Sequence, residues 1–260
     1  MNNVIDARQI NLSPSGATKK NNLSFNSDLE FNIINLIKNQ SYILYNKIKI
    51  SHCEIPFSFY IINEYNNKLV LSTGIIYIPY GNYNANSFIS TLSLLLPINM
   101  TITLNSSNGK FTLKYNTSFT ILQTSNIYKI MGFKINTSYI STENEIILPF
   151  PANFLGTNNI YIKCPNLILD NYNTITKDYI TLLSIPVNVP PFGIIQYLNS
   201  SNISNLVKNI QLDNLEIKIT DDDNNLIDFN NLEWNITIEI ESVIQLTQNT
   251  KTLKDYLSEK

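Results

Sequence analysis

The chain has 260 residues and a formal net charge of -2, and only 15% of its residues are charged. Average domains carry about 25% charged residues, so this chain is sparsely charged. Because its net charge is -2, it also lacks the basic surplus typical of nucleic-acid binding. Its length fits one large all-β domain. Forty-one asparagines against four alanines indicate few helices, because alanine is the best helix former and asparagine favours turns.

Apolar segments long enough to cross a membrane are missing from the sequence. The longest, near 88–96 and 146–155, fall short of the roughly 20 apolar residues that a spanning helix needs. The first 12 residues do not combine a basic segment with an apolar one, so we expect no secretory signal and a soluble protein. Cys53 and Cys164 are far apart in the sequence and are expected to be buried, reduced thiols.

The polar amino-terminal segment contains Pro14, Gly16, Lys19 and Lys20, which predicts an N-terminal arm over 1–27. Strand patterns follow in chain order at 31–37, 42–50, 57–62, 68–78, 100–104, 110–115, 146–148, 160–164, 182–187 and 194–197. Strands and turns recur too regularly for an α/β fold. We therefore expect a β-sandwich over 28–250, followed by a short tail over 251–260.

Two short helices interrupt the strand pattern. Asn84 or Asn86 can cap a helix through Leu95, and Thr124 or Ser125 can begin another that Gly132 ends. Between them, the Asn-Gly pair at 108–109 supplies the positive-φ residues of a tight hairpin. Residues 84–133 are therefore predicted to form a small α-β-β-α insertion.

The clearest strand of the sequence runs over 232–240. Its apolar residues alternate with polar ones and are Leu232, Trp234, Ile236, Ile238 and Ile240. This period of two predicts a central strand with one buried face. The segment 215–219, the turn at 221–225 and the segment 226–229 predict a hairpin, with a bulge at 230–231.

Candidate catalytic residues are few. His52 is the only histidine and directly precedes Cys53 and Glu54. Neighbouring strand residues point to opposite faces, so a Cys-His nucleophile pair is not expected. One histidine and two distant cysteines also fall short of the usual four zinc ligands. No catalytic, cofactor-binding or metal-binding residue is predicted.

The acidic residues Asp221, Asp222, Asp223 and Asp228 are the best candidates for a cation site. An EF-hand loop starting at Asp221 would need glycine and glutamate where the sequence has Leu226 and Leu232. A looser calcium turn and a solvated turn tip both remain open. A further set of aromatic residues could line a glycan or partner site or belong to the core; these are Tyr77, Tyr80, Tyr83, Phe150, Phe154, Tyr172 and Phe192.

Short motifs give the sequence a family resemblance. They are EIPFSFY at 54–60, IPYGNY at 78–83, MGF at 131–133, IPV at 185–187, PPFG at 190–193 and IDFNNLEW at 227–234. Together they resemble the penton and minor capsid proteins of virophages, Polinton-like viruses and giant DNA viruses. In that family an IPxSFY element precedes an IPxGNY turn and helix, a Gly-Phe pair closes the insertion, and an IDFNNxxW strand ends the domain. Tyr80 stands where the family would have a charged residue.

The resemblance implies a single jelly-roll β-sandwich with the small inserted α/β subdomain. It further implies a non-enzymatic penton protein without a cofactor, forming homopentamers at icosahedral vertices beside a separate major capsid protein. Such a protein would be found in the virion and assembled in the host cytoplasm. Three alternatives stay open: a minor capsid protein of the triplex or cement type, a carbohydrate-binding β-sandwich that attaches to a host glycan receptor, and a hydrolase, which the missing motifs disfavour.

Overall fold

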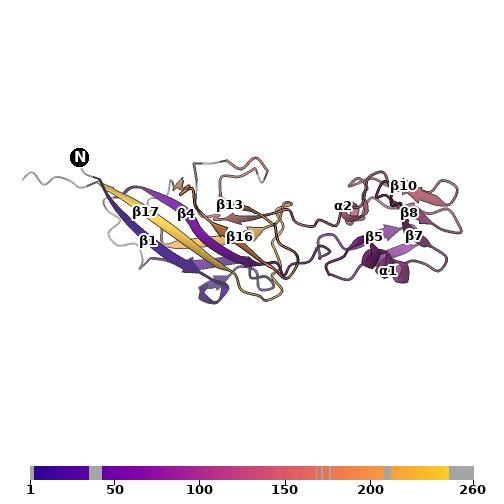
Figure 1. Ribbon diagram of the computed structural model, residues 1–260, viewed down its shortest axis with the longest axis horizontal. Coiled ribbons are helices and arrows are strands. Elements are labelled where there is room, and N and C mark those ends of the chain that lie inside the picture. Colours follow the sequence, from indigo (N-terminus) through magenta and orange to yellow (C-terminus); the bar gives the residue numbers. More distant parts are fainter. Residues whose placement is uncertain are drawn as a thin grey trace, which may run out of the picture. The chain divides into compact units, whose positions relative to one another are not determined.

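The computed structural model describes residues 3–34, 43–167, 169–170, 172–175, 177–207 and 212–245. The chain divides into two compact units. Unit 1 consists of Met1–Ser58 and Asn159–Lys260, and unit 2 consists of Phe59–Asn158. Figure 1 shows long strands in unit 1 and shorter ones in unit 2.

The first sheet of unit 1 is antiparallel and contains the longest strands of the chain. Its order is β1-β17-β4-β14, and β15 pairs with β4 on the same side as β14. The strands are β1 (Asn3–Leu12), β4 (Ile43–Pro56), β14 (Ile194–Leu198), β15 (Asn205–Val207) and β17 (Asn235–Gln245). Figure 1 shows β1, β17 and β4 running side by side.

The second sheet of unit 1 is also antiparallel, in the order β13-β12-β16-β3-β2. Its strands are β2 (Lys19–Lys20), β3 (Asp28–Asn32), β12 (Asn159–Lys163), β13 (Thr181–Pro186) and β16 (Asn214–Thr220). A 3-10 turn, η1 (Pro14–Gly16), links the two sheets between β1 and β2.

These two sheets form a jelly roll, as predicted. The eight main strands can be lettered B to I in chain order, as β1, β3, β4, β12, β13, β14, β16 and β17. The first sheet then has the order B-I-D-G and the second has the order C-H-E-F, which are the two sheets of a jelly-roll sandwich. Unit 2 is inserted between strands D and E, which are β4 and β12.

The predicted arm over 1–27 is wrong for its first part. Strand β1 pairs with β17 continuously from Asn3 opposite Gln245 to Leu12 opposite Ile236. Ile10 and Leu12 are buried. The segment looked like an arm because an edge strand with only one buried face contains many polar residues. The predicted tail at 251–260 lies outside the described residues.

The carboxy-terminal strand is central, between β1 and β4, but it begins later than predicted. Asn230 and Asn231 both have positive φ, and the Leu232 amide donates to the Phe229 carbonyl at 2.9 Å. This turn leaves Leu232 51% exposed, whereas Trp234 is buried. The predicted hairpin is present only near its turn: Leu226 forms an antiparallel bridge with Thr220, and the Ile227 amide donates to the Ile219 carbonyl at 3.1 Å, but 226–229 does not form a strand.

Unit 2 contains two small antiparallel sheets and two helices. The first sheet has the order β10-β9-β5-β6 and the second has the order β11-β8-β7. The strands are β5 (Lys68–Leu71), β6 (Gly74–Tyr77), β7 (Thr101–Leu104), β8 (Phe111–Lys114), β9 (Thr120–Ile121), β10 (Tyr139–Ile140) and β11 (Glu145–Ile147). The unit is larger than the predicted 84–133 insertion. Strands β5, β10 and β11 pair with strands of that segment, β6 pairs with β5, and these strands contribute to the same apolar core.

The first helix, α1 (Ala85–Leu95), begins where the sequence predicts. The Asn84 side chain accepts from the Ser87 amide at 2.9 Å, and the Ser87 hydroxyl accepts from the Asn84 amide at 3.0 Å, which is a capping box. The second helix, α2 (Tyr128–Met131), starts later than predicted, since Ser125 instead accepts from the Val70 amide. The predicted strand at 57–62 contributes only the bridge from Ile62 to Gly81.

Candidate interaction surfaces

Strand β4 places Cys53 on a different face from its neighbours His52 and Glu54. Cys53 faces the core and is fully buried, whereas His52 and Glu54 are partly exposed, with 4.0 Å between Nε2 and Oε1. Burial raises the pKa of the Cys53 thiol to about 12 and also raises the pKa of the Cys164 thiol. Both cysteines are free and buried. The geometry therefore does not bring a thiolate nucleophile to the histidine.

In the acidic turn at 221–225, the Asp221 carboxylate binds the backbone of the turn itself. Asp221 Oδ1 accepts from the amides of Asp223 and Asn225 at 2.9 and 2.8 Å. Desolvation raises the pKa of Asp221, and these hydrogen bonds oppose the rise. Asp228 Oδ1 is engaged elsewhere, by the Asn230 amide at 2.8 Å. Within the described residues, no three His, Cys, Asp or Glu side chains are grouped so that they could hold a metal ion.

The candidate aromatic residues do not form a single platform. Tyr172 and Phe192 belong to unit 1, and the other five belong to unit 2. Within unit 2, Tyr83 and Phe154 pack against the buried ring of Phe88, with centroid distances of 6.2 and 5.4 Å. The other three side chains in unit 2 are exposed: Tyr77, Tyr80 and Phe150.

Phe192 is held on the surface in a strained backbone conformation. Its φ is +71° and its side chain is 85% exposed. The Gly193 amide donates to the Pro190 carbonyl at 3.0 Å, so 190–193 is a β-turn with Phe192 at the position where a type II turn favours glycine or asparagine. Backbone hydrogen bonds from Phe192 to Phe57 and from Phe57 to Gly193, both 2.9 Å, fix this turn. An exposed aromatic ring on a strained, pinned turn suggests a contact site.

One edge of the jelly roll is free of charge. Strands β13 and β14 form this uncharged edge, which lies within a run from 179 to 207 that contains no charged residue. In the described part of the chain, β13 pairs only with β12 and β14 only with β4. Exposed edge strands usually carry charges that prevent pairing with other chains. The opposite edge does carry them, at Lys19 and Lys20 of β2.

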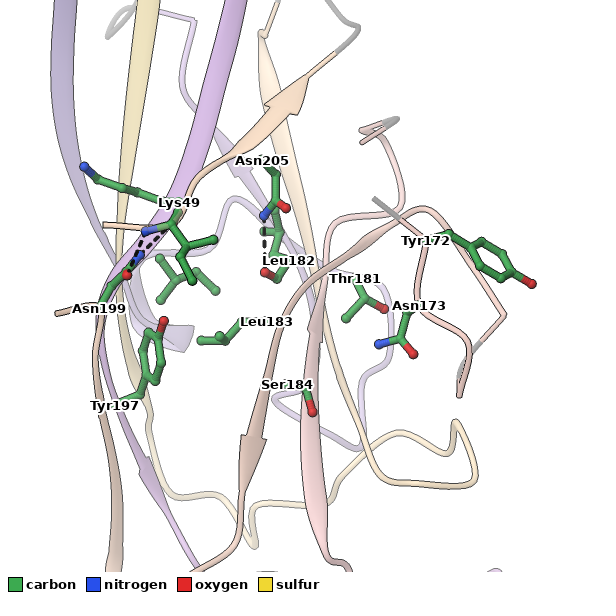
Figure 2. A pocket seen from close by; sticks show the side chains of 12 residues that line it. Lys49, Tyr172, Asn173, Thr181, Leu182, Leu183, Ser184, Tyr197, Asn199 and Asn205 are labelled. Atoms are coloured by element: carbon green, nitrogen blue, oxygen red, sulfur yellow. Dashed lines mark hydrogen bonds between the residues drawn. The ribbon is translucent and has the colours of Figure 1, made fainter. Parts of the chain in front are cut away.

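A pocket of about 280 Å³ opens between the two strands of the uncharged edge. Its apolar lining comes from Ile50, Leu182, Leu183, Tyr197 and Ile203. Figure 2 shows the side chains of Leu183 and Tyr197 within the space between the strands, whereas Tyr172 points away from it. The pocket therefore offers an apolar floor at the edge of the sandwich.

The rim of this pocket is held by amide side chains. Asn205 Nδ2 donates to the Leu182 carbonyl at 3.3 Å and so connects β15 to β13. Asn199 and Ile203 exchange hydrogen bonds of 2.8 and 3.1 Å, which close the loop between β14 and β15. Ile203 is thereby fixed at the mouth of the pocket.

The one charged group of the pocket, Lys49, is neutralised. Its Nζ lies 2.9 Å from Glu239 and 3.4 Å from Glu241, and it donates to Asn202. The hydrogen bond to Glu239 is the main cause that raises the pKa of Lys49, and burial opposes it. Because two carboxylates surround the ammonium group, the pocket does not favour an anion.

Sequence reasoning named Tyr172 and Phe192 but missed the pocket. The run without charge over 179–207 was a usable signal, because 29 consecutive uncharged residues are unexpected for a surface segment. The proximity of β13 and β14 across the sandwich could not be read from the sequence, since the two strands belong to different sheets.

Solved structures similar to the chain include a viral protein. The chain is similar to the mavirus penton protein with 12% sequence identity and a TM-score of 0.41, over 93% of this chain and all of that one. No protein-family model and no curated protein matches the chain. None of the helices in the described residues is long and apolar enough to span a membrane.

Proposed function

We propose that this chain is a non-enzymatic capsid protein, the penton of an icosahedral virion, and that it forms homopentamers at the vertices. The observation that carries the proposal is the complete jelly-roll strand order of unit 1 in a chain whose motifs resemble the penton family. Its neighbours would be further copies of itself and the major capsid protein. It would reside in the virion and assemble in the host cytoplasm.

The motif residues support this proposal because they hold the fold together. Ser58 Oγ of the first motif donates to the Phe229 carbonyl of the last motif at 2.7 Å, and Asn230 Nδ2 donates back to the Ser58 carbonyl. Within unit 2, Asn82 of the second motif accepts from the Ile61 amide at 2.9 Å. Residues far apart in the sequence therefore determine one another's positions, which explains why they would recur together as a family pattern.

Glycine 132 of the third motif supports the resemblance in the same way. Its φ is +83°, and a Cβ atom there would lie 2.2 Å from the Phe150 carbonyl oxygen. Only glycine can end α2 at this point.

The two edges of unit 1 suit a cyclic assembly. A ring uses heterologous contacts, in which one face of a subunit meets a different face of the next. The uncharged edge and the lysine-bearing edge lie on opposite sides of the sandwich. They are therefore two different surfaces, as a ring requires.

Quantitative mass spectrometry of purified virions tests this proposal. A penton should be present at five copies for each of the twelve vertices. A copy number comparable to that of the major capsid protein would instead indicate a minor capsid protein beneath the facets, and absence from the virion would overturn the proposal.

A further inference from the structure

We infer that the pocket of the uncharged edge receives the side chain of Leu23 from a second copy of this chain. The inference rests on the proposed homopentamer and identifies its subunit contact. The pocket lies between β13 and β14, and Leu23 lies in the loop between β2 and β3.

Leu23 is a fixed apolar projection. It is 92% exposed, which leaves nearly all of an aliphatic side chain in water. Its loop is tied at both ends, because Lys20 Nζ donates to Asn26 at 2.8 Å and the Asn21 amide donates to the Asp28 carbonyl at 3.0 Å. The Ser24 amide also donates to the Asn22 side chain at 2.8 Å. A pre-organised loop loses little conformational entropy when it binds.

The pocket has the chemistry and size for an aliphatic side chain. Its volume is about 280 Å³, and Leu182, Leu183 and Tyr197 supply apolar surface in its lining. A leucine would displace water from the apolar surfaces of Leu182, Leu183 and Tyr197, which is favourable at about 25 cal/mol for each Å² removed from water. The one charged group that lines the pocket, Lys49, is already paired with Glu239 and Glu241, so the leucine would meet no unpaired charge.

Position and charge favour a second copy as the occupant. Strand β2 is at one edge of the second sheet and β13 is at the other edge, so Leu23 cannot reach the pocket of its own copy across the three intervening strands. Every copy carries both parts, and their placement on opposite edges makes the contact heterologous. Lys19 and Lys20 accompany Leu23, and they would meet no like charge on the run from 179 to 207.

Cysteine cross-linking between two different chains tests the contact. One chain carries Leu23→Cys and the other carries Ile203→Cys at the mouth of the pocket, and the full-length proteins are mixed and oxidised with copper phenanthroline. The native thiols are fully buried and should not react. We expect a covalent heterodimer in the mixture and a ladder ending at a closed pentamer when one chain carries both substitutions.

Leu94→Cys mixed with Ile203→Cys is the matched control, since Leu94 is 87% exposed but lies in unit 2. A heterodimer yield with Leu23→Cys no higher than with Leu94→Cys would overturn the inference. If virions still show five copies at each vertex in that case, the inference fails and the proposed function stands. If the cross-link forms but virions lack such rings, the contact between copies stands and the penton proposal fails.

Discussion

The indole nitrogen of Trp234 donates a hydrogen bond of 2.6 Å to the backbone oxygen of Asn26. This bond connects the residue just before β17 of one sheet to the segment before β3 of the other. The ring also meets Phe31 edge-on, with 6.3 Å between the centroids, and is fully buried. Trp234 therefore joins the two layers of the jelly roll at the end of the IDFNNLEW motif.

We expect Trp234→Ala to lower the free energy of unfolding by about 3 to 5 kcal/mol, because it leaves a large cavity between the sheets. Trp234→Phe should cost less, since it keeps an aromatic ring and loses mainly the hydrogen bond. Urea denaturation of both variants measures the difference. A loss below about 1 kcal/mol for the alanine variant would be the size expected of a surface residue and would contradict this role.

Gly132 and Gly109 provide a matched pair of substitutions in unit 2. Both have positive φ, but a Cβ at Gly109 meets its nearest neighbour at 3.4 Å, whereas one at Gly132 would lie 2.2 Å from the Phe150 oxygen. Gly109→Ala should cost about 1 to 2 kcal/mol, the strain of a left-handed residue. Gly132→Ala should cost clearly more, since the backbone must also move. Equal losses in thermal unfolding would show that the close approach is unimportant.

Phe192→Asn should stabilise the chain by about 1 kcal/mol, because asparagine tolerates the left-handed conformation that strains phenylalanine. Little burial is lost, since the ring is 85% exposed. Chemical denaturation gives the change, and Ile194→Asn, at an exposed position of the adjacent strand β14, serves as the control without a gain. Destabilisation by Phe192→Asn would mean that the ring is packed within the subunit.

The buried thiols predict a loss of stability at alkaline pH. Burial raises the pKa of Cys53 from 9.0 to about 12. Its contribution is fully present below pH 9, where both states keep the proton. Between pH 9 and 12 the unfolded chain releases a proton that the folded chain retains, so the free energy of unfolding should fall by about 1.4 kcal/mol per pH unit from this group.

The slope of stability against pH checks this prediction. Cys53→Ala should make the fall above pH 9 less steep, whatever it does to the stability at neutral pH. Alkylation of the native protein at pH 8 should also be slow, because the thiolate is scarce and buried. Rapid labelling of Cys53 would contradict its burial and would reopen a catalytic role.

The sequence predicted the local features well where one physical signal dominates. The asparagine cap predicts the start of α1 at Asn84, and the Asn-Gly turn predicts the β7-β8 hairpin. The missed features depend on distant partners. Strand β1 is a strand because β17 pairs with it, and unit 2 extends to Phe59–Asn158 because its outer strands join the inserted sheets.

The candidate surfaces also combine features that local sequence predicts with features that depend on distant partners. Phe192 could be selected from its motif, but its strain appears only in the backbone geometry. The pocket beside β13 and β14 arises where edges of two different sheets come together. No spacing rule relates such residues, since their proximity follows from the jelly-roll topology.

Cryo-EM of the assembled particle tests the central claim most directly. The account predicts five copies of this jelly roll around each five-fold axis, with the uncharged edge of one copy against the lysine-bearing edge of the next. Copies arranged beneath the facets, away from the five-fold axes, would contradict it and would identify a minor capsid protein.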